Sequence, residues 1–116
     1  MAKGVLRRET FAAGQAIFTA GDPSKAAYLI QAGVVEVTAQ RDGHDVVLNT
    51  LVAGDLVGEM ALVDSKPRSA TAKAKQTATC VVVTPLELTE RIERSDPFVR
   101  AMVRALSRKL RHTTFE

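Results

Sequence analysis

The sequence predicts a mainly β fold that ends in two helices. Glycines divide the first half of the chain into short apolar runs, at intervals of roughly ten residues: Gly14, Gly21, Gly33, Gly43, Gly54 and Gly58. Turn signals at this spacing are typical of an all-β sandwich or barrel rather than of βαβ units. After residue 85 the apolar residues recur at helical intervals instead, so helices are expected to follow the strands.

Length, charge and cysteine content limit the possible classes of protein. A chain of 116 residues can form one packed core, and we expect a single domain over residues 1–116. The net charge of +3 would help to attract an anionic ligand but is a weak argument for nucleic-acid binding. No apolar run approaches the length of a membrane span, and no secretory signal is evident. Cys80 is the only cysteine, which excludes an internal disulfide and favours a reducing, cytoplasmic setting.

Short runs of apolar and β-branched residues predict the strands. They are expected at residues 16–19, 27–31, 34–39, 46–51, 69–75 and 79–84. Asp42-Gly43 suits a tight hairpin between the third and fourth of these strands. Residues 1–10 are polar and basic, and we expect a loose lead-in or one helical turn there.

Two helices are expected after the strands, over about residues 86–94 and 97–111. The first starts near Pro85 or Glu87. In the second, Asp96 suits the N-cap and Pro97 the first helical position. One face of the second helix is apolar, with Phe98, Met102, Leu106 and Leu110 at four-residue steps. Another face is basic and carries Arg100, Arg104, Arg108 and Arg111.

Residues 58–72 form a candidate anion-binding segment. Gly58 allows a close approach of the backbone to a ligand, and residues 59–63 suit a short helical turn whose first N–H groups are free to bind a phosphate. Pro67 ends the turn, and Arg68 offers a planar fork for the same phosphate. Glu59 would repel a phosphate, so its expected partner is a neutral hydroxyl such as that of a ribose. A phosphate and a ribose hydroxyl together describe a nucleotide.

This segment resembles the phosphate-binding cassette of the cyclic nucleotide-binding domain family, found in the bacterial catabolite activator, cyclic AMP-dependent kinase regulatory subunits and cyclic nucleotide-gated channels. The shared pattern is Gly-Glu, an apolar run, a short polar loop, Pro-Arg, a small residue and Ala. The resemblance covers about residues 11–111. It implies an antiparallel β-roll of the jelly-roll or double-stranded β-helix type over about residues 11–84, with the short phosphate-binding helix inside the roll and both longer helices after it.

The resemblance also implies roles for individual residues. Backbone groups of Gly58, Met60 and Ala61 would face the phosphate, Arg68 would pair with it, and Glu59 would accept from the ribose 2′-hydroxyl. Ser69 follows Arg68, where the family has threonine in many cyclic GMP sites and alanine in cyclic AMP sites. Serine leaves the choice of base open, with cyclic AMP favoured. An arginine of the last helix, Arg104 or Arg108, could stack on the purine as a lid.

Simpler interpretations remain for each feature. Arg68 could be a solvated surface residue, Glu59 could merely favour the start of a helix, and the basic stripe could be a solvated face. For the whole chain, the main alternatives are a β-roll interaction module without a ligand, or a nucleic-acid binder that uses the basic helix.

No nucleophile–base arrangement is evident, so an enzyme is not expected. His44 and His112 are too far apart in sequence to predict a metal site, and no cofactor is expected besides the cyclic nucleotide ligand. The expected partners are this ligand and a protein partner or a second copy of the chain, without a DNA-binding domain or membrane segment in the 116 residues.

Overall fold

The computed structural model describes residues 6–62 and 66–113, with only the backbone given for residues 111–113. Within these residues the chain forms strands, one 3₁₀ turn (η1) and two helices. In chain order they are β1 (Arg8–Phe11), β2 (Ala16–Phe18), β3 (Ala27–Arg41), β4 (His44–Leu51), β5 (Leu56–Val57), η1 (Glu59–Leu62), β6 (Thr71–Val83), α1 (Pro85–Glu93) and α2 (Pro97–Thr113). The predicted fold class, mainly antiparallel β with two C-terminal helices, is confirmed.

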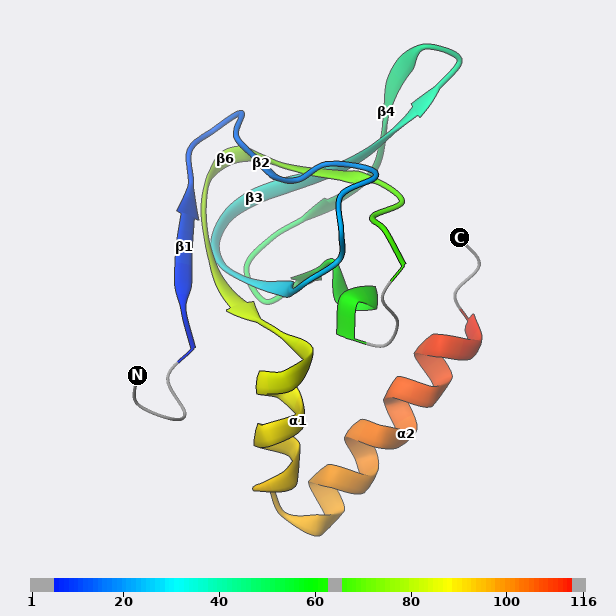
Figure 1. The fold of residues 1–116 in the computed structure, drawn as a ribbon. Helices are drawn as coiled ribbons and strands as arrows, with labels where there is room; N and C mark the ends of the chain where they lie inside the picture. The colour runs from blue at the N-terminus through cyan, green and yellow to red at the C-terminus, as the bar shows by residue number, and fades with distance from the viewer. Residues whose placement is uncertain (1–5, 63–65, 114–116) are drawn as a thin grey trace.

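The long strands β3 and β6 form the centre of the sheet. They pair with each other in antiparallel fashion from Ala27↔Val83 to Thr38↔Thr71. β1 and β2 both pair with β6, whereas β4 and β5 both pair with β3, and every pairing is antiparallel. Figure 1 shows β3 and β6 curving together into a roll, with η1 at its lower opening and α1 continuing from the end of β6.

Two predicted breaks lie inside continuous strands. The predicted strands 27–31 and 34–39 are one strand, β3, and 69–75 and 79–84 are joined in β6. Gly33 does not end β3 but lies where its pairing with β6 changes register. A Cβ on Gly33 would lie 2.2 Å from the carbonyl oxygen of Thr77, so the glycine permits a close approach of the two strands.

The lead-in predicted for residues 1–10 is wrong where the structure describes it. Residues 8–11 are β1, which pairs with β6 from Arg8↔Val81 to Phe11↔Ala78. Phe11 is buried in the core. The polar side chains of this segment give no apolar pattern from which a strand could be predicted. β1 is an edge strand, and it is fixed mainly by its backbone hydrogen bonds and by one inward-facing residue. The two-residue strand β5 was also missed.

The predicted turn and helix starts are confirmed. Asp42 and Gly43 both have positive φ, 53° and 80°, as a two-residue hairpin turn requires. The Asp96 carboxylate accepts the N–H groups of Phe98 and Val99 at the start of α2. Thr84, predicted as the end of a strand, is instead the N-cap of α1 and forms a capping box with Glu87.

Small and β-branched residues fill the inside of the roll. Its most deeply buried large side chains are Ile30, Val35, Val82 and Cys80. Ala72 and Ala74 of β6 are also fully buried and share one face of the strand. The roll is packed around this core, and its open end leaves room for a pocket.

Candidate functional site

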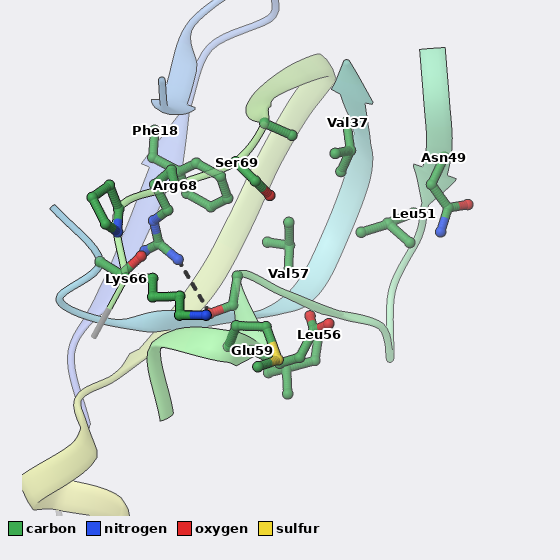
Figure 2. Close-up of a pocket in the computed structure, with 15 residues that line it drawn as sticks. Phe18, Val37, Asn49, Leu51, Leu56, Val57, Glu59, Lys66, Arg68 and Ser69 are labelled. Carbon is green, nitrogen blue, oxygen red and sulfur yellow. Dashed lines mark hydrogen bonds between the residues drawn. The ribbon is translucent and has the colours of Figure 1, made fainter. Parts of the chain in front are cut away.

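A pocket of about 300 Å³ lies at the open end of the roll. Its lining comes from β2, β3, β4 and β5, from Ser24, and from residues 58–60 and 66–70. The volume is at the lower end of the range for small-molecule sites, roughly 300–1,000 Å³. In Figure 2, Arg68 and Lys66 lie at one end, Asn49 and Leu51 lie at the other, and Phe18 and Glu59 lie on opposite edges.

The segment singled out in the sequence lines this pocket. Gly58, Glu59, Met60, Arg68 and Ser69 all contribute to its wall. Ala61 lies behind the wall instead: its side chain is buried, and its N–H donates to the carbonyl oxygen of Gly58 at 3.1 Å. Residues 63–65, in the middle of the predicted cassette, are outside the described residues.

Arg68 is the central side chain of the site and is only 8% exposed. Its guanidinium lies 3.9 Å from the centre of the Phe18 ring. One terminal nitrogen donates to the Gly58 carbonyl oxygen at 3.2 Å, and the other donates to the Ala26 carbonyl oxygen at 2.5 Å. Nε is buried and has no hydrogen-bond partner among the described residues.

The backbone of Arg68 is held by the turn that residues 19–22 form. The Arg68 N–H donates to the Asp22 carbonyl oxygen, and the Gly21 N–H donates to the Arg68 carbonyl oxygen, both at 2.8 Å. This turn therefore has a specific role, because it fixes the arginine at the wall of the pocket.

No carboxylate in the described part of the chain contacts Arg68 to balance its charge. Among the described residues, no carboxylate oxygen lies within 4 Å of its guanidinium. Burial lowers the pKa of Arg68 from its ordinary value, while the more distant Tyr28, Asp22 and Glu59 act in the opposite direction. A buried cation of this kind is unfavourable unless an anion pairs with it, so the site is suited to an anionic group.

Gly58 shapes the wall beside Arg68. Its φ is +75°, and a Cβ at this position would lie 2.6 Å from Nη1 of Arg68 and 3.0 Å from the Phe18 ring. A larger residue would therefore collide with the guanidinium and its aromatic support. Only glycine combines this backbone conformation with the contact.

Glu59 begins η1, and its half-buried side chain lines the pocket. The predicted helical turn is thus a four-residue 3₁₀ turn. Figure 2 places Glu59 at the edge opposite Phe18, away from the guanidinium. This separation would let the Glu59 carboxylate accept from a neutral donor while Arg68 pairs with an anion.

Arg100, Arg104 and Arg108 of α2 do not line the pocket in this structure. No residue of α2 within the described part of the chain lines it, and Figure 1 shows α2 to one side of the roll, rising from its junction with α1. Arg104 instead forms an ion pair with Glu93 of α1 at 2.6 Å, and Arg100 donates to the Glu93 carbonyl oxygen. Arg108 is exposed, and the side chain of Arg111 is outside the described part.

Several lining residues were not predicted. Phe18, Val37, Asn49 and Leu51 come from three different strands. Alternation along β3 and β4 could have indicated which side chains face inward, but the curvature that brings them opposite Arg68 has no local signal.

Neither a metal site nor a membrane helix is found in the described residues. They contain no group of three or more His, Cys, Asp or Glu side chains that could hold a metal ion. None of their helices is long and apolar enough to span a membrane.

Comparison with protein families matches residues 8–95 to the cyclic nucleotide-binding domain. The cAMP-dependent protein kinase regulatory subunit of Emericella nidulans is 42% identical over 65 residues, which are 56% of this chain and 15% of that protein. The cyclic AMP receptor protein of Thermus thermophilus is 29% identical over 117 residues, covering 100% of this chain and 54% of the receptor. The chain therefore spans about half the receptor's length and a much smaller part of the kinase subunit.

Solved structures show the same fold. The half-site-occupied form of the EAL enzyme Bd1971 has a TM-score of 0.87 at 31% identity, over 96% of this chain and 100% of that one. Its cAMP-bound form has a TM-score of 0.70 at 32% identity, over 91% of this chain and 29% of that one. Its cGMP-bound form has a TM-score of 0.71 at 32% identity, over 90% of this chain and 28% of that one. From the family match over most of its length, the chain belongs to the cyclic nucleotide-binding domain family.

Proposed function

We propose that the pocket binds a cyclic mononucleotide, cyclic AMP in preference to cyclic GMP, and that the chain acts as a regulatory sensor module. The observation that carries this proposal is the buried guanidinium of Arg68, which lines the pocket with an unpartnered Nε and no contacting carboxylate among the described residues. A cyclic phosphate would supply both the missing charge and acceptors for its N–H groups.

The other contacts that we propose use groups that line the pocket. Glu59 accepts a hydrogen bond from the ribose 2′-hydroxyl, and Gly58 and Met60 line the phosphate side with Ser69. The base then occupies the end of the pocket walled by Val37 and Leu51. Because Ala61 already donates its N–H to Gly58, a phosphate contact from this group requires η1 to rearrange.

One observation supports cyclic AMP: the similar kinase subunit and receptor are both named for it. Bd1971, also similar, has been solved in both cAMP-bound and cGMP-bound forms and does not distinguish the two ligands. Ser69 has a hydroxyl that either ligand could use, so the preference is expected to be modest.

Occupancy would be transmitted through Gly58. Its carbonyl oxygen accepts from both Arg68 and the N–H of Ala61 in η1, and η1 contacts α1. Pairing of Arg68 with a phosphate would remove one of these bonds, so a ligand would favour a different position of η1 and of the helices that follow.

A protein partner or a second copy of the chain is the expected receiver of this signal. Phe98, Met102 and Leu106 of α2 are exposed and lie on one face of the helix. The names of the similar proteins, a regulatory subunit and a receptor, support a binding rather than a catalytic role for this chain.

Calorimetric titration of the purified chain with cyclic AMP, cyclic GMP and 5′-AMP tests the proposal. We expect binding of the cyclic nucleotides, tighter for cyclic AMP, and none of 5′-AMP. Absence of binding to both cyclic forms would overturn it and favour a β-roll interaction module. Binding to unrelated DNA that falls steeply with salt would favour the basic helix as a nucleic-acid site.

A further inference from the structure

Phe18 of β2 contacts the guanidinium of Arg68, and its ring centre lies 3.9 Å from Cζ of the arginine (Figure 2). At this distance the negative face of the ring attracts the cation. An aromatic ring is a weak hydrogen-bond acceptor, so it can hold the charge without satisfying the N–H groups. Nε of Arg68 indeed has no hydrogen-bond partner among the described residues.

A bulge in β2 turns Phe18 toward the pocket. Residues 16 and 18 pair with residues 73 and 72 of β6, which leaves Ile17 as an extra residue in β2. In a regular strand, neighbouring side chains point to opposite faces. Here Ile17 belongs to the buried core, and Phe18 packs against the same core while it lines the pocket. The bulge therefore lets two successive side chains face the inside of the roll.

Phe18 is itself anchored by two further rings. Its ring centre lies 6.2 Å from that of Tyr28, with 38° between the ring planes. Tyr28 packs edge-on against Phe11 at 6.1 Å, and Phe11 is buried in the core. Aromatic pairs favour such tilted and edge-on contacts at these distances. The three rings thus connect the guanidinium of Arg68 to the packed interior of the roll.

Gly58 restricts the guanidinium from another direction. A Cβ on Gly58 would lie 2.6 Å from Nη1 of Arg68 and 3.0 Å from the Phe18 ring, so these three residues pack closely together. A solvated arginine side chain has many rotamers, and ordering one of them when a ligand arrives weakens binding. The contact with Phe18 orders Arg68 before any ligand is bound.

We infer that Phe18 is a positioning residue of the anion site, whose ring holds the Arg68 guanidinium at the pocket wall before the ligand arrives. The inference rests on the proposed function, because it takes Arg68 to pair with the phosphate of the ligand. It deepens that function by adding to the site a residue of β2, distant in sequence from the segment 58–72.

Calorimetric titration with cyclic AMP tests the inference on wild type, Phe18→Leu, Phe18→Tyr and Phe11→Leu. Phe18→Leu keeps an apolar side chain but loses the ring, so it should weaken binding about two- to tenfold, the effect of ordering one long side chain. Phe18→Tyr keeps the ring and should bind within about twofold of wild type. Phe11→Leu is the control, because Phe11 belongs to the same ring cluster but does not line the pocket. It should lower stability to urea and leave the affinity nearly unchanged.

The same change in an Arg68→Lys background separates positioning from direct contact with the ligand. Lysine has no planar guanidinium to lie on the ring, so Phe18→Leu should there weaken binding by less than about twofold. Losses that simply multiply would show that the ring touches the ligand itself and would overturn the positioning role.

Two further outcomes are decisive. Wild-type affinity in Phe18→Leu, or equal losses in Phe18→Leu and Phe18→Tyr, would overturn this inference alone. A wild-type chain that binds neither cyclic AMP nor cyclic GMP would overturn the proposed function together with it.

Discussion

Arg68 combines features that are unfavourable in a protein without a ligand. Its guanidinium is buried and lies over the Phe18 ring, and its terminal nitrogens donate to two backbone carbonyl oxygens. Nε has no hydrogen-bond partner among the described residues. Carbonyl groups satisfy donors but do not neutralise a charge. An arginine held in this way is prepared for an anion, and its planar fork matches two phosphate oxygens.

Replacing Arg68 therefore tests the site most directly. Arg68→Ala should weaken cyclic nucleotide binding by at least about a hundredfold, because a charge-assisted hydrogen bond is lost and a buried phosphate is left unpaired. Arg68→Lys should fall between wild type and alanine, since it keeps the charge but loses the fork and the stacking on Phe18. Calorimetry measures both effects.

Lys73→Ala provides the control for this pair, because Lys73 is an exposed cation on β6 outside the pocket. Its removal changes the net charge of the chain by the same amount and should leave affinity nearly unchanged. Wild-type affinity in Arg68→Ala would contradict the assignment of Arg68 to the phosphate.

Gly58 offers a second test, with a matched control in Gly54. Both residues have positive φ, +75° and +95°, but a Cβ meets Arg68 only at Gly58 and nothing within 4 Å at Gly54. Either change to alanine should lower the free energy of unfolding by about 1–3 kcal/mol through backbone strain. Gly58→Ala should in addition weaken ligand binding about tenfold or more, because displacing the guanidinium disrupts a charged hydrogen bond.

Denaturant unfolding of the two glycine variants measures the effect of backbone strain on stability. Calorimetry measures the effect on ligand affinity of the contact between the new Cβ and Arg68. Equal affinities of Gly58→Ala and Gly54→Ala would mean that the space beside Arg68 is unimportant for the ligand.

At the scale of elements, the junction between β6 and α1 is fixed by a capping box. The hydroxyl of Thr84 accepts from the Glu87 N–H, and the Glu87 carboxylate accepts from the Thr84 N–H, at 3.1 and 3.0 Å. The latter hydrogen bond is the main cause of a lowered pKa for Glu87. The box sets the direction in which α1, and therefore α2, leaves the roll.

Thr84→Ala should lower the free energy of unfolding by about 1 kcal/mol near neutral pH. Because the folded-state pKa of Glu87 is lowered, its stabilising contribution is present above the ordinary glutamate pKa of about 4.3 and is lost as pH falls through the folded value. The difference between wild type and Thr84→Ala should shrink only slightly in acid, because alanine keeps the backbone N–H at position 84 and loses just the hydroxyl's hydrogen bond to the Glu87 carboxylate. Urea unfolding near neutral pH and in acid measures this difference in the free energy of unfolding. Thr89→Ala, an exposed change in the same helix, is the control.

Elements were predictable from sequence where local chemistry decides them. Asp42-Gly43 specifies the hairpin turn between β3 and β4, and Asp96 specifies the start of α2. The residues around Arg68, singled out from the sequence, line the pocket. β1 was missed because an edge strand depends on a partner, β6, that is distant in sequence. Gly33 was misjudged for a related reason: in isolation a glycine indicates a turn, whereas here it lets two strands approach.

For the molecule as a whole, the pocket exists only after the roll has closed. Phe18, Asn49 and Arg68 belong to segments far apart in sequence, and of the three only Arg68 lies in a recognisable local motif. Local motifs can therefore predict the phosphate side of the site, while the base side depends on the curvature of β3 and β4. The position of α2 was likewise beyond local prediction, because the exposed pair Arg104–Glu93 adds little energy to it, about 0–1 kcal/mol.

A pocket built from most of the strands couples ligand binding to unfolding of the entire roll. A ligand that binds the folded state alone stabilises it by about 2.7 kcal/mol at a concentration a hundred times its dissociation constant. For a chain of this length, such a gain should raise the melting temperature by about 10 °C. Cyclic AMP and cyclic GMP should each produce this shift at matched saturation, 5′-AMP should not, and Arg68→Ala should abolish it at the same ligand concentration. An equal shift with 5′-AMP would mean that the pocket holds any nucleotide phosphate and does not select the cyclic form.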